Sequence, residues 1–101
     1  MADLPVVCTL NPAARAARQE RLLANLVRRA GEHLEIANGH RLKFQPAEDV
    51  LPTLARTVDL ERQCCRFLQF TITVEPDGGE ISLDLTGPAG THEFLAALME
   101  L

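Results

Sequence analysis

Hydrophobic and polar residues alternate most regularly in residues 67–86. Two runs with an apolar residue at every second position flank the sequence Pro-Asp-Gly-Gly. Such alternation is typical of strands with one buried face, and proline and glycine favour the turn between them. A four-residue loop pairs Val74 with Ile81 and places both apolar sets on one face. The pattern therefore predicts a β-hairpin over residues 67–86.

A second pair of alternating runs flanks Asn38 and Gly39, a dipeptide typical of hairpin loops. A strict two-residue loop would place the apolar residues of the first run on the same face as Arg41 and Lys43. A three-residue loop with a bulge at Gly39 would restore a single apolar face, so we prefer that register. It pairs Ile36 with Leu42, Leu34 with Phe44, and Glu35 with Lys43.

Three segments have apolar residues spaced by three and four, as amphipathic helices do. The first covers residues 13–30 and ends before Gly31, a residue typical of helix C-termini. An alternative extends this helix to Ala37. The second covers residues 47–66, and the third follows residues 86–88. The three apolar stripes are Leu23, Leu26, Val27 and Ala30; Leu51, Leu54, Ala55, Val58 and Cys65; and Phe94, Leu95, Leu98 and Leu101.

This order of elements, α-ββ-α-ββ-α, predicts an α+β fold. Two hairpins with one apolar face each need a cover, which amphipathic helices supply. We expect a four-stranded, mainly antiparallel sheet with the helices on one face. The chain has 101 residues, of which 47% are hydrophobic. We therefore expect a single domain over residues 1–101, with residues 1–10 as an extended arm.

The charge and composition argue against two classes of partner. The net charge is −4, whereas nucleic-acid binding normally requires a basic surface. The chain has no Trp or Tyr and four Phe, too few for a platform on which bases stack. No apolar run approaches the roughly 20 residues that cross a bilayer, and the N-terminus lacks the features of a secretory signal. We expect a cytoplasmic protein that binds neither nucleic acid nor membranes; protein partners and a homo-oligomeric state are left open.

The three cysteines are the most distinctive residues for chemistry. An odd number of cysteines in a chain without an export signal indicates reduced thiols. Cys64 and Cys65 are adjacent near the end of the second predicted helix, and Cys8 precedes the first. Because soft ions select thiolates, these cysteines predict a site for Cu(I), Hg(II) or As(III), with Glu61 and Arg62 as auxiliary residues.

Two other functions are compatible with the same cysteines. In a thiol redox or sulfur-transfer protein, Cys8 would be the nucleophile, because a helix N-terminus favours a thiolate. In an interaction domain, the cysteines would be packing residues, since free cysteine is often buried. The histidines His33, His40 and His92 lie in different elements without the spacing of metal ligands, so we expect them at the surface.

Three segments together resemble a set of small bacterial proteins of uncharacterised function. The resemblance spans nearly the whole chain and implies this layout of elements, but no activity. Arg66 stands where the similar proteins often have proline. The matching segments are Cys8-Thr9-Leu10, Glu61-x-x-Cys64-Cys65-x-Phe67-Leu68-x-Phe70, and Thr86-Gly87-Pro88-x-Gly90.

Overall fold

The structure is a computed structural model that describes residues 24–99. The predicted α+β fold and the order α-ββ-α-ββ-α are confirmed. Of the first predicted helix, residues 24–29 are helical, and its earlier part and the arm lie outside the described residues. The remaining elements are β1 (Glu32–Ile36), β2 (Gly39–Phe44), α2 (Val50–Cys64), β3 (Gln69–Val74), β4 (Ile81–Thr86) and α3 (Thr91–Leu98).

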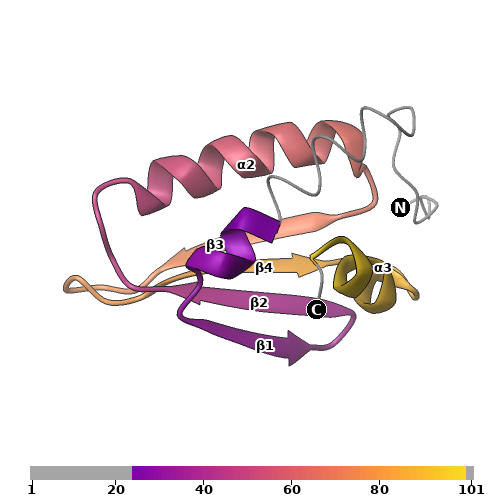
Figure 1. Cartoon of the computed structure of the whole chain (residues 1–101), viewed down its shortest axis with the longest axis horizontal. Coiled ribbons are helices and arrows are strands. Elements are labelled where there is room, and N and C mark those ends of the chain that lie inside the picture. Colours follow the sequence, from indigo (N-terminus) through magenta and orange to yellow (C-terminus); the bar gives the residue numbers. More distant parts are fainter. Residues whose placement is uncertain (1–23, 100–101) are drawn as a thin grey trace.

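The four strands form one antiparallel sheet in the order β1-β2-β4-β3 (Figure 1). Val74 pairs with Ile81, so the predicted register of the β3–β4 hairpin is confirmed. The two hairpins join through β2 and β4, where Leu42 lies opposite Leu83. The centre of the sheet is therefore built by one strand from each hairpin.

The hydrophobic core lies between one face of the sheet and the helices. In Figure 1 the helical segment 24–29 and α3 lie in front of the sheet, and α2 runs beside them near β3. α2 contacts β3 and β4, whereas α3 contacts β2. The core side chains that are most completely buried are Leu42, Leu54, Cys65, Leu83, Leu85 and Leu95.

The opposite face of the sheet carries mainly polar side chains. At its centre Arg41 of β2 lies opposite Asp84 of β4. The guanidinium Nε and Nη2 donate to the two carboxylate oxygens of Asp84 at 2.7 and 2.9 Å. This paired interaction raises the pKa of Arg41 above its ordinary value. The ion pair thus links the two hairpins on the side away from the core.

The buried face of α2 differs from the predicted apolar stripe. Leu54 and Cys65 are buried as expected, but Leu51 is 40% exposed and Ala55 is exposed. Two polar residues, Thr57 and Glu61, lie on the buried face instead. The observed buried face is therefore rotated relative to the predicted stripe. The prediction used hydrophobicity alone and so left out the polar members of this face. The buried face consists of Val50, Leu54, Thr57, Glu61 and the following Cys65.

The predicted register of the β1–β2 hairpin is wrong. Ile36 pairs with Gly39, so the loop consists of Ala37 and Asn38, and Asn38 adopts a positive φ of 57°. Gly39 is the first residue of β2 and pairs with Thr86 of β4, whose backbone passes close to it. A Cβ added there would lie 1.9 Å from the carbonyl oxygen of Leu85. Glycine at this position allows β2 and β4 to approach each other closely; it does not form a bulge.

This register changes which residues face the core. Leu34 lies opposite Arg41 on the outer face, and the expected pairing of Leu34 with Phe44 does not occur. His33 lies opposite Leu42, and Glu35 lies opposite His40, both on the core side. The alternative in which the first helix continues to Ala37 is also wrong, because this segment contains β1.

The last helix, α3, begins after a tight turn. Gly90 precedes it with a φ of 98°, a conformation that favours glycine. The buried Thr91 hydroxyl donates to the carbonyl oxygen of Pro88 at 2.6 Å. Leu95 is buried and Phe94 packs against the core, as predicted. The Leu98 side chain and Leu101, also predicted to pack, lie outside the description.

Candidate functional site

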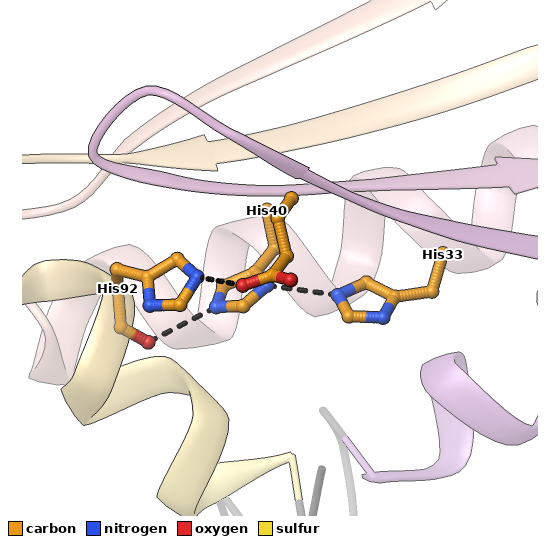
Figure 2. Close-up of polar contacts among 4 residues, drawn as sticks. His33, His40 and His92 are labelled. Carbon is orange, nitrogen blue, oxygen red and sulfur yellow. Dashed lines mark hydrogen bonds and ion pairs between the residues drawn. The ribbon is translucent and has the colours of Figure 1, made fainter.

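Four polar residues from three elements meet on the core side of the β1–β2 hairpin. We call His33 and Glu35 of β1, His40 of β2 and His92 of α3 the histidine cluster (Figure 2). Figure 2 shows His40 between the other two histidines. His40 is 1% exposed, so the expectation that all three histidines lie at the surface is wrong. The actual register of the hairpin places His33 and His40 on the same face.

The hydrogen bonds of the cluster fix the tautomer of His40. Its Nε2 lies 3.0 Å from the carbonyl oxygen of His92. A carbonyl only accepts, so Nε2–H of His40 is the donor. In the neutral ring Nδ1 then carries a lone pair and accepts from Nε2–H of His33 at 2.8 Å. Both nitrogens of this buried imidazole therefore have protein partners.

Ring contacts hold the same residues together. The ring planes of His33 and His40 lie within 28° of each other, with their centroids 4.9 Å apart. These values suit a hydrogen bond directed roughly within the two ring planes. The rings of His40 and His92 are stacked, with centroids 4.4 Å apart and planes within 21°. His92 completes the cluster through Nε2–H, which donates to Oε1 of Glu35 at 2.5 Å.

The surroundings of His40 oppose its protonation. Burial lowers the pKa of His40 below its ordinary value of 6.5, and the nearby His92 and His33 lower it further. The hydrogen bond to the His92 carbonyl and the Glu35 carboxylate act in the opposite direction and are outweighed. A protonated His40 would also lose the lone pair that accepts from His33. The cluster is therefore organised around one neutral imidazole.

The other members of the cluster are more exposed than His40. The side chain of His92 is 34% exposed and that of Glu35 is 69% exposed. His33 is half-buried. In the described part of the chain, no group of three or more His, Cys, Asp or Glu side chains is arranged to hold a metal ion. The chemistry that the histidine cluster offers includes the uptake, release and transfer of protons.

The predicted thiolate site is described only in part. Cys65 is a free thiol with no exposed surface, and it belongs to the hydrophobic core. Its Sγ lies 3.9 Å from Oε2 of Glu61, which is also completely buried. Cys8 and the side chain of Cys64 lie outside the described residues. Whether the three thiols converge therefore stays a prediction.

The two auxiliary residues of that prediction have different surroundings. Glu61 belongs to α2 and lies on the buried face of this helix. Arg62 is exposed, and its guanidinium forms an ion pair with Asp59 on the same helix, with Nη2 2.9 Å from Oδ1. The burial of Cys65 is compatible with the interpretation in which the cysteines are packing residues.

Sequence reasoning missed the histidine cluster because of one choice of register. A loop made of Ala37 and Asn38 would have placed His33 and Glu35 beside His40. The signal was the even spacing of polar residues at 33 and 35, which we assigned to the outer face. The approach of His92 depends on how α3 packs and has no local signal.

The comparisons with known proteins add no family to this picture. Comparison of the sequence with protein-family models gave no match, and comparisons with curated proteins and with solved structures gave none either. Within residues 24–99, the helices are all too short or too polar to cross a membrane. The geometry of the histidine cluster is therefore the basis for a functional proposal.

Proposed function

We propose that this domain is a proton-responsive switch, in which protonation of His40 weakens the attachment of α3 to the β1–β2 hairpin. The observation that carries the proposal is the environment of His40. This side chain is 1% exposed, and both of its ring nitrogens are hydrogen-bonded to protein groups. Protonation of such a group removes the lone pair on Nδ1 that accepts the hydrogen bond from His33, so its neighbours would have to rearrange.

His40 is covered from two sides by groups that titrate or carry charge. β1 contributes His33 and Glu35, and α3 contributes His92. On β4, the residue opposite His40 is the apolar Leu85, which offers no counter-charge. A proton on His40 would thus be placed next to two other imidazoles with one carboxylate in reach. His40 therefore favours its neutral state while α3 is packed against the β1–β2 hairpin.

Moving α3 away would relieve this constraint. The carbonyl and the ring of His92 in α3 both contact His40. Without them, His40 would be open to water and its pKa would return toward the ordinary value. The state with α3 displaced therefore binds a proton more readily than the closed state. By linkage, acidification shifts the equilibrium toward displacement.

Hydrogen exchange of the α3 amides tests this proposal. We expect their protection factors, corrected for the intrinsic effect of pH, to fall as pH decreases below 6.5, by up to about tenfold per pH unit. The amides of β3 and β4 should lose less protection over the same range. Protection of α3 that stays constant from pH 7.5 to 5 would contradict the proposal.

Two glutamine variants separate His40 from its neighbour. His40→Gln keeps an N–H donor for the His92 carbonyl but cannot take up a proton. We expect α3 in this variant to lose its dependence on pH. His33→Gln keeps a donor toward His40 and leaves His40 able to titrate, so the dependence should remain. Equal behaviour of the two variants would show that His40 is not the responsible group.

A further inference from the structure

The imidazole of His92 is held in place by contacts that leave one nitrogen unused. Its ring is stacked on His40, and its backbone carbonyl accepts a hydrogen bond from the same residue. Nε2 is bonded to the carboxylate of Glu35. Among the described residues, Nδ1 of His92 has no hydrogen-bond partner. The side chain as a whole is 34% exposed.

The contact with Glu35 determines where the lone pair of His92 lies. An ionised carboxylate only accepts hydrogen bonds, so Nε2 of His92 carries the hydrogen. In the neutral ring the lone pair is then on Nδ1, the unused nitrogen. A carboxylate that orients an imidazole in this way also stabilises the positive charge that develops when the other nitrogen reacts. The two residues form a carboxylate–histidine pair with a defined reactive atom.

The geometry points to Nδ1 of His92 as a nucleophile toward activated carboxylic esters, with Glu35 as its positioning residue. We favour an uncharged acyl donor because the carboxylate of Glu35 beside the His92 ring disfavours a phosphoryl dianion. This inference does not depend on the response of α3 to pH.

The reaction needs only the ester and water. Nδ1 attacks the ester carbonyl, the N–C bond forms, and the C–O bond to the leaving alcohol breaks. The acylated ring is cationic until the hydrogen on Nε2 passes, through Glu35 or water, to the leaving alkoxide, which departs as the alcohol. Water then cleaves the N–C bond, releases the carboxylic acid and restores the imidazole. The net change is hydrolysis of one ester to one acid and one alcohol.

Hydrolysis of p-nitrophenyl acetate by the full chain at pH 7.5 tests the inference. Because thiolates also attack this ester, the informative rate is the part that His92→Gln removes. We expect Glu35→Gln to lower that part by about tenfold or more, since the ring then loses its fixed orientation. Glu32→Gln is the matched control: it neutralises an exposed carboxylate of the same strand that pairs opposite Lys43 on the outer face. It should leave the rate unchanged.

Nitrogen NMR distinguishes a positioning role of Glu35 from a merely structural one. In the wild-type protein, ¹⁵N shifts should show His92 as the tautomer with hydrogen on Nε2. In Glu35→Gln the two tautomers should become mixed while the remaining spectrum stays the same. The inference is overturned if His92 carries its hydrogen on Nδ1, or if His92→Gln leaves the hydrolysis rate unchanged. Reaction with phosphoramidate but not with the ester would also overturn the choice of an acyl donor.

Discussion

At the scale of single residues, Gly39 shows how one position decides the geometry of the sheet. Its Cα faces the backbone of β4 so closely that an added Cβ would lie 1.9 Å from the Leu85 carbonyl oxygen and 2.9 Å from the Thr86 Cα. Both atoms belong to the backbone of a central strand, which cannot rotate away. The glycine is therefore required by contact between strands, although its neighbour Asn38 makes it resemble a loop residue.

We expect Gly39→Ala to destabilise the protein by about 1–3 kcal/mol, because β2 would have to move away from β4. Urea denaturation monitored by circular dichroism measures this change. Gly31→Ala is the control, since the nearest atom to its added Cβ would be the Lys43 carbonyl oxygen at 3.8 Å, an ordinary contact. Its effect should be about 0.5 kcal/mol or less. Equal losses in the two variants would contradict the explanation.

At the scale of elements, the sequence predicted the type of each element better than the pairing between them. The β3–β4 hairpin was predicted with its register because Val74 and Ile81 belong to long, unambiguous alternations. In β1 only five residues alternate, and Leu34 competes with His33 for the core face. Hydrophobicity favours a leucine on the core face. The pairing of β2 with β4, however, places Gly39 within β2, and this leaves Ala37 and Asn38 as the loop. A contact between distant segments overrides the local pattern there, and the histidine cluster follows from it.

The burial of Cys65 at the end of α2 gives a prediction about thiol reactivity. In Cys8→Ser, Cys64→Ser double variants, Cys65 is the single thiol. Because it has no exposed surface, we expect its alkylation by iodoacetamide to be at least about 100-fold slower in the folded protein than in urea. Mass spectrometry over time measures the two rates. Rapid alkylation of the folded protein would show that the end of α2 opens readily, and would make Cys65 available to a soft metal ion.

At the scale of the whole molecule, the two helices that follow the hairpins are attached in different ways. α2 contacts β3 and β4 mainly through buried side chains such as Leu54, whereas α3 reaches β2 partly through the polar contacts of His40 and His92. Apolar contacts do not depend on pH, but the contacts of an imidazole do. The attachment of α3 therefore includes an imidazole contact that acid can change.

This asymmetry predicts the sign of the pH dependence of global stability. His40 has a lowered pKa in the folded protein and an ordinary one, near 6.5, in the unfolded chain. Below pH 6.5 the unfolded state binds a proton that the folded state excludes, so the free energy of unfolding decreases as pH falls. Above pH 6.5 both states are neutral at this site, and its contribution is fully present.

Urea denaturation between pH 7.5 and 5 measures this contribution. We expect the wild-type free energy of unfolding to fall by up to about 1.4 kcal/mol per pH unit below pH 6.5, until the folded protein also becomes protonated. His40→Gln removes the titrating group and should give a flatter profile over the same range, whatever its stability at pH 7.5. A variant profile as steep as that of the wild type would mean that other groups, and not the buried imidazole, make this fold sensitive to acid.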